Sequence, residues 1–458
     1  MAYPRSAASG VIRAARAWVG GRFVPADIEF ADGVITRVDD PSGSARGAQI
    51  VPDDAVLLPG LVDSHVHVNE PGRTEWEGFR SATLAAAAGG VTTIVDMPLN
   101  SLPPTTTAEA LAVKQAAAAP SAYIDVGFWG GAVPENLGRL RPLHDAGVYG
   151  FKCFLSPSGV PEFGHLDRAQ LAAAMDEIAA LGSRLIVHAE DPALLHDDGP
   201  LGRDYAAFLA SRPAESEASA IDAVIAEARR SGARAHILHL SDAGSLPAIR
   251  RAKAEGVDLT VETCPHYLTI AAEEIPSGSA EFKCCPPIRN ASNRDRLWEG
   301  IVDGTIDAIV SDHSPSTLDL KRSGGGDFGL AWGGISGLQV GLSAVWTEAR
   351  ARGIALDRVI PLYTTGPARI AGLEAGVIEP GAPAHLTVFG TDDPYPIRAA
   401  QLLHKNPITA YENRVLRGRV RRTWLHGRSV FDVTEGGPGE APEFRGSPGG
   451  RLLSREAG

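Results

Sequence analysis

Two histidines separated by a single residue are the first feature of this sequence that could do chemistry. His65 and His67 lie in "VDSHVHVNEPGR", directly after an apolar run. In an extended chain, alternate side chains project to the same side, so these two imidazoles converge on one point. Two imidazoles on one face can clamp a divalent metal ion. A pair of core or surface histidines has the same spacing, so the motif by itself leaves both interpretations open.

Polar residues also end three other apolar runs. His188 follows "IV" in "IVHAED", His239 lies in "HILHLSDA", and Asp312 lies in "AIVSDHSPS". A single histidine at a strand end is commonly a hydrogen-bonded structural residue. Four histidines and one aspartate at the ends of apolar runs are harder to explain by packing, and imidazole with carboxylate is a ligand set that suits zinc. We therefore expect a metal centre assembled from distant parts of the chain.

Three more histidines compete for roles near this centre. His236 lies an odd number of residues before His239, and the alternation of a strand predicts that it points to the opposite face. His266, in "VETCPHYLT", and His313, beside Asp312, could contact a substrate or support a metal ligand from behind. The ligand set proposed above therefore stays as the main interpretation.

Lys152 is a cation in the apolar segment "VYGFKCFL", which contains no acidic residue. Burying an unpaired ammonium costs several kcal/mol, so the group must become neutral or find an anion. Two divalent ions held close together need a bridging anion, and the candidate ligands include no bridging carboxylate. A neutral lysine amine could capture carbon dioxide and become a carbamate, a bidentate anion. The alternative is an ion pair with a carboxylate from another strand; the histidines favour the carbamate.

The elements that position these residues form a regular pattern. Eight apolar, strand-like runs are separated by alanine-rich or amphipathic segments, of which residues 81–90 and 166–182 have the spacing of surface helices. The eight runs are residues 55–63, 91–97, 122–130, 148–155, 184–190, 235–241, 257–264 and 306–312. This alternation predicts an α/β fold in which eight parallel strands close into a TIM-like (β/α)8 barrel. Active sites of such barrels lie at the C-terminal ends of the strands, where the candidate ligands stand.

The two flanks of the chain have a different pattern. Residues 14–40 and 384–431 alternate apolar and polar side chains, with glycine-containing turns, which predicts hairpins. We expect the N- and C-terminal flanks to form one small β-sandwich beside the barrel. The expected domains are a composite β-sandwich of residues 1–56 and 375–434, a catalytic barrel of residues 57–374, and a disordered tail of residues 435–458 rich in Gly, Pro and charge.

Composition narrows the range of partners. The chain has 458 residues, 44% of them hydrophobic, and a formal net charge of -12. The acidic balance and the lack of a basic stripe argue against nucleic acid or an anionic membrane surface as a partner. No run of about 18 apolar residues could span a bilayer. Four cysteines without a CxxC pair indicate reduced thiols. We expect a small-molecule substrate and a cytoplasmic location.

Several longer segments resemble the amidohydrolase superfamily, and within it the cyclic amidohydrolases: dihydroorotases, hydantoinases and allantoinases. The resemblance covers most of residues 14–431, and it is greatest to the allantoinases. The segments that carry it are residues 59–106, "GFKCFLSPSGVPEF" (150–163), "VETCPHYLT" (261–269), "KCCPPIRN" (283–290), "SDHSPS" (311–316) and "WGGISGLQ" (332–339). These segments are long enough to be specific.

The resemblance implies a site with two divalent metal ions. It makes His65 and His67 ligands of the more buried ion and His188 and His239 ligands of the more exposed ion. Carboxylated Lys152, an N6-carboxylysine formed from carbon dioxide, would bridge the two. Zinc suits histidine-rich ligation, and iron, cobalt, nickel and manganese remain alternatives. The family also implies a homotetramer.

The resemblance further implies that Asp312 binds the first metal and acts as general base and acid, with a hydroxide shared by the two ions as nucleophile. Cys285 and Ser314 occupy positions that contact the substrate in relatives. Asn100 is a weaker candidate contact, since an asparagine that caps a loop is equally compatible with its position.

Two departures from related enzymes bear on the substrate. Dihydroorotases carry an arginine two residues after the HxH motif, where this chain has Asn69. Hydantoinases carry a tyrosine five residues after the bridging lysine, where this chain has Pro157. The resemblance therefore implies hydrolysis of allantoin to allantoate, a step of purine catabolism. The alternatives are a hydantoinase or dihydropyrimidinase acting on another cyclic amide, and a non-catalytic assembly protein of the same lineage.

Overall fold

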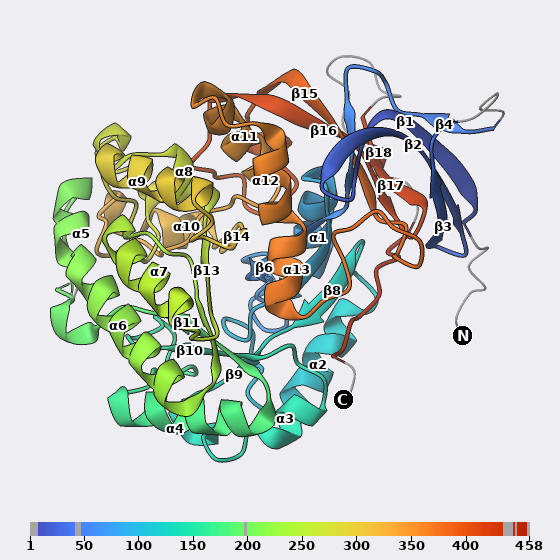
Figure 1. Cartoon of the computed structure of the whole chain (residues 1–458). Coiled ribbons are helices and arrows are strands. Elements are labelled where there is room, and N and C mark those ends of the chain that lie inside the picture. Colours follow the sequence, from blue (N-terminus) through green and yellow to red (C-terminus); the bar gives the residue numbers. More distant parts are fainter. Residues whose placement is uncertain (1–7, 42–46, 197–198, 434–442, 445–446, 456–458) are drawn as a thin grey trace.

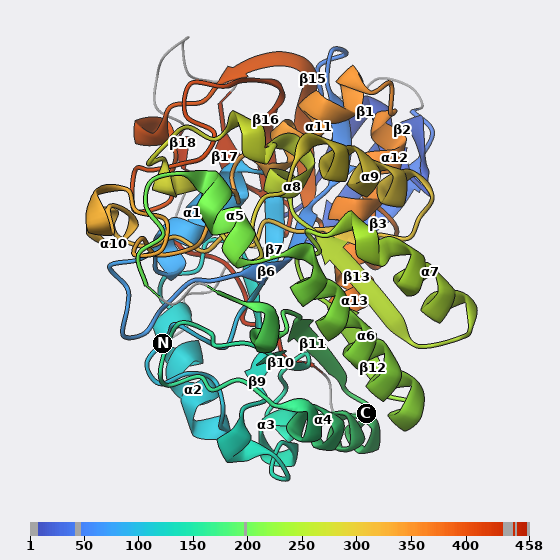
Figure 2. The same ribbon diagram turned by 90° about the vertical axis from the view of Figure 1, so that its left-hand side faces the viewer.

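The structure is a computed structural model that describes residues 8–41, 47–196, 199–433, 443–444 and 447–455. Within these residues the strands form three hydrogen-bonded sheets, two of parallel strands and one that is mostly antiparallel. Helices surround the parallel strands, and the large antiparallel sheet lies at one side of the molecule (Figures 1 and 2). The observed class is therefore the expected mixed α/β fold with parallel-strand sheets.

The two flanks of the chain pair in one nine-stranded sheet, in the order β18-β17-β16-β15-β5-β1-β2-β3 with β4 beside β1. Its strands are β1 Gly10–Val19, β2 Arg22–Ala31, β3 Val34–Asp39, β4 Gln49–Ile50, β5 Val56–Pro59, β15 Leu386–Pro396, β16 Val415–Leu425, β17 Arg428–Asp432 and β18 Glu443–Phe444. The hairpins expected in both flanks are present, and β15 pairs antiparallel with β5 to join them. Their division into a separate sandwich domain stays a prediction.

The parallel strands follow the expected apolar runs but are shorter. They are β6 Leu61–Val66, β7 Val91–Asp96, β8 Asp125–Phe128, β9 Gly130–Gly131, β10 Phe151–Phe154, β11 Arg184–His188, β12 Arg234–Ile237, β13 Leu259–Thr263 and β14 Ala308–Ile309. Strands β6 to β8 form one parallel sheet and β9 to β14 another. The run at residues 55–63 divides, because β5 joins the flank sheet while β6 begins the parallel strands.

Helices cover the outer side of the parallel strands; α4 packs on β11, α6 on β12 and α7 on β13 (Figure 2). The helices are α1 Phe79–Ala88, α2 Ala108–Ala118, α3 Arg141–Asp145, α4 Arg168–Leu181, α5 Tyr205–Ser211, α6 Ala214–Ser231, α7 Leu246–Ala254, α8 Pro265–Thr269, α9 Ala291–Val302, α10 Leu318–Lys321, α11 Gly341–Ala351, α12 Leu356–Tyr363 and α13 Thr365–Ala371. The helices predicted over 81–90 and 166–182 are α1 and α4.

Helix α4 shows how the sequence sets these boundaries. The Asp167 side chain accepts a hydrogen bond from the Gln170 backbone N–H, while the Gln170 side chain accepts one from the Asp167 N–H, which forms a capping box. Gly182 ends the helix with a φ of 62°, in the left-handed region that favours glycine. The apolar face of α4 thereby turns toward β11.

The expectation of a disordered tail is wrong for part of residues 435–458. Residues 450–455 run along the start of β8: Leu452 forms a parallel bridge with Val126, and the Leu453 N–H donates to the Val126 carbonyl at 2.8 Å. The tail is rich in Gly and Pro, but its backbone forms hydrogen bonds with groups on β8 that would otherwise be unpaired. These hydrogen bonds offset the conformational entropy lost when the tail becomes ordered. Residues 434–442, 445–446 and 456–458 lie outside the described residues.

Two other expectations concern membrane-spanning helices and disulfide bonds. In the part of the chain that the structure describes, no helix has the length and apolar character needed to cross a bilayer. The four cysteines all lie in that part, and no disulfide joins them.

Candidate metal centre

The six candidate ligands come from five different parallel strands or the residues that directly follow them. His65 lies within β6 and His67 just beyond it, Lys152 lies in β10, His188 ends β11, His239 follows β12 and Asp312 follows β14. All six side chains are buried. Because parallel strands direct their C-terminal ends to the same edge, residues far apart in the sequence meet there.

His65 is held from behind by a carboxyl group. Its Nδ1 lies 2.6 Å from Glu262 Oε1, and its Nε2 lies 3.2 Å from Asp312 Oδ1. Burial lowers the pKa of His65 well below its usual value and raises the pKa of Glu262 to about 8. A carboxyl group on one ring nitrogen orients the other toward the centre, as in histidine ligands of metals.

Lys152 lies at the middle of the cluster. Its Nζ is 3.4 Å from the Nε2 atoms of both His65 and His67. Burial lowers the pKa of the amine to about 8. The negative charges of Asp312 and Glu262 act in the opposite direction and raise that pKa, but burial has the larger effect. Among the described residues no carboxylate forms a hydrogen bond with Nζ, and two imidazole nitrogens face it instead. A substantial fraction of this amine is neutral near pH 8, which is the form that reacts with carbon dioxide.

His188 and His239 form the second part of the cluster. His188 Nδ1 and His239 Nε2 face each other at 3.0 Å, and His188 Nε2 lies 2.7 Å from Glu190 Oε2. Burial lowers the pKa of both imidazoles, so both rings are neutral at pH 7. Neutral imidazoles present lone pairs, which is the protonation state that metal binding requires.

Asp312 and His239 both have backbone conformations that non-glycine residues rarely adopt. The φ angles are 42° at Asp312 and 35° at His239. Such angles cost of order 1–3 kcal/mol and persist where the surrounding structure imposes them, commonly at functional sites. Burial also raises the pKa of the Asp312 carboxyl to about 7, with the nearby Lys152 charge opposing the shift. The carboxyl can therefore both take up and release a proton near neutral pH.

The donor atoms fit divalent metal ions. One donor atom each from His65, His67 and Asp312 lie within 4.8 Å of one another, and all three residues are buried. The Nδ1 atom of His67 has no hydrogen-bond partner in the described structure. Buried imidazole and carboxylate groups that meet without complementary donors and acceptors are costly unless a cation joins them. This side of the cluster, the His188–His239 pair and the intervening Lys152 thus fit a site for two ions.

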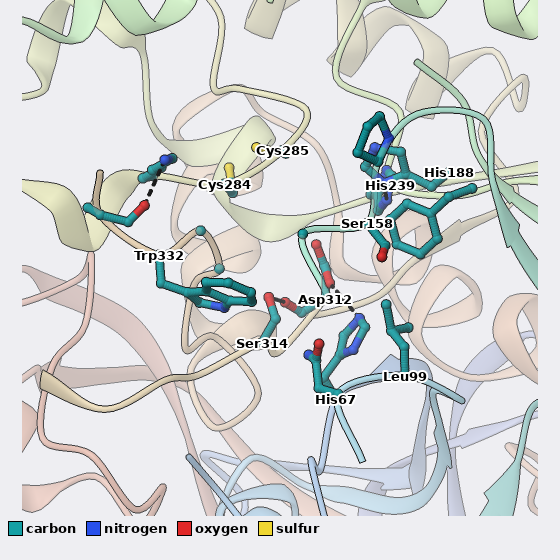
Figure 3. Close-up of a pocket in the computed structure, with 18 of the residues that line it drawn as sticks. His67, Leu99, Ser158, His188, His239, Cys284, Cys285, Asp312, Ser314 and Trp332 are labelled. Carbon is teal, nitrogen blue, oxygen red and sulfur yellow. Dashed lines mark hydrogen bonds and ion pairs between the residues drawn. The ribbon is translucent and has the colours of Figure 1, made fainter. Parts of the chain in front are cut away.

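A pocket of about 330 Å³ opens over this centre. Figure 3 shows His188 and His239 on one side of it and Trp332, Cys284 and Cys285 on the other. The three candidate substrate contacts, Asn100, Cys285 and Ser314, all line this pocket. His65 does not line it and is fully buried below the surface.

Two of the candidate contacts are themselves positioned by hydrogen bonds. Asn100 donates through Nδ2 to Asn69 Oδ1 at 3.1 Å, and the Ser314 hydroxyl donates to the Asp312 carbonyl at 2.9 Å. Asn69, which stands where dihydroorotases carry arginine, donates to the Pro315 carbonyl. Pro157 also lines the pocket. At these two discriminating positions the chain therefore has neither a cation nor a phenol.

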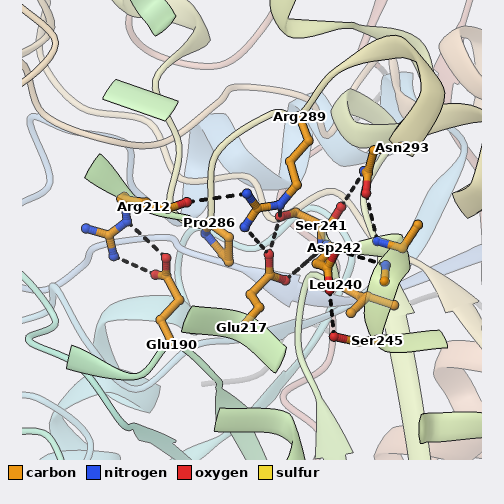
Figure 4. A network of polar contacts seen from close by, with 12 residues as sticks. Glu190, Arg212, Glu217, Leu240, Ser241, Asp242, Ser245, Pro286, Arg289 and Asn293 are labelled. Atoms are coloured by element: carbon orange, nitrogen blue, oxygen red, sulfur yellow. Dashed lines mark hydrogen bonds and ion pairs between the residues drawn. The ribbon is translucent and has the colours of Figure 1, made fainter. Parts of the chain in front are cut away.

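A buried ionic network supports the strands that carry His188 and His239 (Figure 4). Arg212 forms two hydrogen bonds to Glu190, the residue that contacts His188. Burial would raise the pKa of Glu190, but the charge of Arg212 and the hydrogen bond from His188 outweigh it and hold that pKa well below the usual range. Glu190 is therefore a carboxylate that keeps an N–H on His188 Nε2 and leaves Nδ1 directed at His239.

The second half of the network involves Glu217 and Arg289. Arg289 Nη2 donates to Glu217 Oε2 at 2.7 Å, and its Nη1 donates to the Arg212 carbonyl at 3.3 Å. Glu217 Oε1 accepts from the Ser241 N–H at 3.0 Å. Because Ser241 lies two residues beyond His239, this pair holds the end of β12 in place.

The sequence analysis missed Glu262, Glu190 and Arg212. Each carboxylate was detectable in principle: Glu262 lies near the end of the run at residues 257–264, and Glu190 stands two residues after His188. No sequence pattern pointed to Arg212, because it lies in a helical connection and comes near the site only when the chain has folded.

The structure places the three histidines that were considered as alternatives, His236, His266 and His313, in different surroundings. The prediction that His236 points away from the site is wrong, since its Nε2 lies 3.0 Å from Glu262 Oε2. β12 ends at Ile237, so strand alternation does not extend from His236 to His239. His266 forms a cluster with Cys264 and Asp312, and His313 Nε2 lies 3.4 Å from Glu77 Oε2. His266 therefore lies close to Asp312, and the supporting role of both histidines stays a prediction.

Comparison with known proteins agrees with this geometry. Residues 56–430 match the amidohydrolase family. An allantoinase from Streptomyces avermitilis is 55% identical over 94% of this chain and 95% of its own length, and an allantoinase from Saccharomyces cerevisiae is 45% identical over 83% and 84%. Among solved structures, an L-hydantoinase (dihydropyrimidinase) from Arthrobacter aurescens is similar with a TM-score of 0.88 and 28% identity, covering 97% of this chain and 99% of that chain.

Proposed function

The chain belongs to the amidohydrolase family, and we propose that it is a metal-dependent cyclic amide hydrolase that converts allantoin to allantoate. The observation that carries the proposal is the convergence of six buried candidate ligands under one pocket in a chain 55% identical to an allantoinase over 94% of its length. The pocket volume of about 330 Å³ suits a small ring with one side arm.

The proposed ligand set comprises His65, His67, Lys152, His188, His239 and Asp312. Two bound divalent ions, of which zinc suits this set best, would polarise a ring carbonyl and lower the pKa of a water molecule. Lys152 would serve as a carbamate, an anion that could be shared by the two ions. The 3.4 Å contacts of Nζ with the two imidazoles of His65 and His67 support this role.

Asp312 would move the proton during hydrolysis. Its carboxylate takes one proton from the attacking water as the oxygen bonds to the ring carbonyl carbon. The same carboxyl then gives that proton to the ring nitrogen as the C–N bond breaks, so one water is consumed and the ring opens. The pKa of about 7 on this buried carboxyl suits both directions of transfer.

The pocket walls would orient the substrate. Cys285 and Ser314 lie where backbone and side-chain groups can contact the ring amide, and Asn100 offers an amide to a carbonyl or ureido group. Neither Asn69 nor Pro157 supplies the charge or phenol used by related enzymes for other rings. A neutral ring with a ureido arm therefore fits this pocket better than a ring that bears a carboxylate.

At the level of architecture, we propose that the parallel strands close into one eight-stranded barrel. Val66 in β6 bridges His313, just beyond β14, and the Tyr149 N–H, just before β10, donates to the Phe128 carbonyl in β8 at 3.0 Å. Both contacts support closure. The flank sheet would form the accompanying β-sandwich, and the family resemblance supports a homotetramer in the cytoplasm, which light scattering and fractionation would test.

The proposed activity is tested by an assay of one preparation with four rings: allantoin, hydantoin, dihydrouracil and dihydroorotate. We expect turnover of allantoin well above that of the other three, with about two metal ions per chain at this centre. Turnover of another ring without allantoin would favour a hydantoinase or dihydropyrimidinase. A chain without metal and without turnover would favour the non-catalytic assembly protein.

A further inference from the structure

A second cluster of potential metal ligands lies away from the proposed catalytic centre. It consists of Asp125, His385 and His426, all buried, with 2%, 5% and 9% of their surfaces exposed. Asp125 is the first residue of β8, at the opposite end of the strand from the catalytic pocket. His385 immediately precedes β15, and His426 lies in the turn between β16 and β17. Three separate parts of the chain thus meet at one point.

The distances between the donor atoms match those of a tetrahedral site. His385 Nε2 lies 3.4 Å from His426 Nε2 and 3.6 Å from Asp125 Oδ2, and His426 Nε2 lies 3.0 Å from Asp125 Oδ2. A tetrahedral zinc ion with bonds of about 2.0–2.1 Å has edges of about 3.3 Å between its ligand atoms. The three atoms therefore form one face of a tetrahedron around a zinc-sized ion.

The polar groups of the cluster converge on one carboxylate. His426 Nε2 lies 3.1 Å from Asp125 Oδ1 and 3.0 Å from Asp125 Oδ2, and His385 Nε2 lies 3.6 Å from Oδ2. The Arg451 backbone N–H donates to Asp125 Oδ1 at 2.7 Å. A carboxylate oriented by a backbone N–H, with two imidazole nitrogens directed at it, is also the arrangement found around a bound cation.

The backbone at His426 gives independent support. Its φ is 48°, in the left-handed region that non-glycine residues rarely adopt and that persists where the surrounding structure imposes it. The turn continues into Gly427, which also has a positive φ of 71°. A glycine or asparagine at position 426 would meet this backbone requirement at lower cost. A histidine there instead directs an imidazole at Asp125.

A cavity beside the cluster offers a route for the ion and a place for a fourth ligand. The cavity has a volume of about 410 Å³, and Asp125 and His385 line it together with Tyr149 and Arg455. Tetrahedral sites with three protein ligands complete their coordination with water. The cavity therefore reaches two of the three proposed ligand residues.

We propose that Asp125, His385 and His426 bind one divalent transition-metal ion of the zinc class, distinct from the ions of the catalytic centre. The ion ties the flank sheet to the start of β8. It also stabilises the C-terminal segment, which runs from the sheet to β8 (Figure 1) and whose Arg451 holds Asp125. The role is structural, because the site lies at the opposite end of β8 from the pocket.

The test compares the metal content of the full-length chain with that of His385→Gln and Asp125→Asn. After equilibration with Zn²⁺ and gel filtration, we expect each variant to lose about one equivalent of zinc per chain while turnover per chain is retained. His144→Gln is the matched control, since His144 is a buried histidine outside both clusters. It should bind as much zinc as the unaltered chain.

A second measurement uses the unaltered protein and does not depend on variants that fold. In crystals grown with Zn²⁺, anomalous scattering at the zinc edge should give a peak between Asp125, His385 and His426. Cobalt(II) substitution should add an absorption band of tetrahedral type that the His385→Gln variant lacks. Crystals with zinc at the catalytic centre but no peak at this cluster would overturn the proposal, as would equal zinc content in all four proteins.

Discussion

At the scale of single residues, burial determines the chemistry of the catalytic centre. Removal from water lowers the pKa of Lys152 to about 8 and raises the pKa of Asp312 to about 7, so both groups titrate much closer to neutral pH than they do in water. The lysine becomes able to act as a nucleophile toward carbon dioxide, and the aspartate becomes able to exchange a proton. The same burial keeps the four histidines neutral and available as ligands.

Replacing Lys152 tests the proposed bridging role. Lys152→Ala should lose most bound metal and lower kcat/KM by at least about a thousandfold, because the anion between the two sides of the site is missing. Metal analysis and the allantoin assay on the same sample measure both effects. Short carboxylic acids such as acetate or propionate should restore part of each by entering the space left by the side chain.

The control for this prediction is Lys321→Met, which replaces another fully buried lysine outside the candidate ligand set. It should keep its metal and its activity. If Lys152→Ala retained two ions and full turnover, the lysine would have no part in metal binding, and its burial would need a different explanation.

At the scale of secondary-structure elements, the ends of the strands require external support, because the backbone beyond each strand leaves the sheet. The network of Glu190, Arg212, Glu217 and Arg289 supplies it for β11 and β12. It fixes His188 through Glu190 and the residues after His239 through Glu217. The ion pairs at the ends of these strands therefore fix the orientation of the candidate metal-ligand side chains, which the geometry of the strands alone does not fix.

The Glu217–Arg289 pair can be tested with a double-mutant cycle. Glu217→Gln should lower the free energy of unfolding by about 3–5 kcal/mol, because it leaves the Arg289 charge buried without its partner. It should also weaken metal binding through displacement of Ser241. The double variant Glu217→Gln/Arg289→Met should recover part of the stability, since neither charge then remains.

Chemical denaturation and metal titration measure these effects. The exposed pair Arg229–Glu255 serves as the control, and Arg229→Met should change stability by less than about 1 kcal/mol. Equal effects of Glu217→Gln and Arg229→Met would show that burial of the network has no energetic importance.

At the scale of the whole molecule, the N- and C-terminal flanks enclose the parallel strands. β5 connects the flank sheet directly to β6, and residues 450–455 return to pair with the start of β8. The chain thus contacts its own strands at the end opposite to the pocket. The backbone contacts that stabilise the fold therefore lie at the opposite end of the strands from the proposed catalytic residues.

Shortening the chain tests the role of the C-terminal segment. A chain that ends at residue 446 should melt several degrees lower than the full chain, because β8 loses the backbone hydrogen bonds that join Val126 to Arg451 and Leu453. Its turnover of allantoin at 25 °C should stay within about twofold, since the segment lies far from the pocket. Thermal unfolding followed by circular dichroism checks the first expectation, and an unchanged melting temperature would contradict it.

The sequence alone determined the parts of this protein that depend on local pattern. Apolar runs predicted the parallel strands to within a few residues, and apolar spacing predicted the helices at residues 81–90 and 166–182. His65, His67 and Asp312 were identifiable because strand-end position and residue type together indicate chemistry. These features are local, so a linear sequence contains them.

Only the tertiary structure decided which distant residues meet. Glu262 behind His65, Arg212 behind Glu190, and the cluster at Asp125 each depend on contacts between elements many residues apart. The same holds for the C-terminal segment, whose composition predicts disorder but whose backbone finds partners on β8. Pairing energies and pKa shifts arise from burial and proximity, which exist only after the chain has folded.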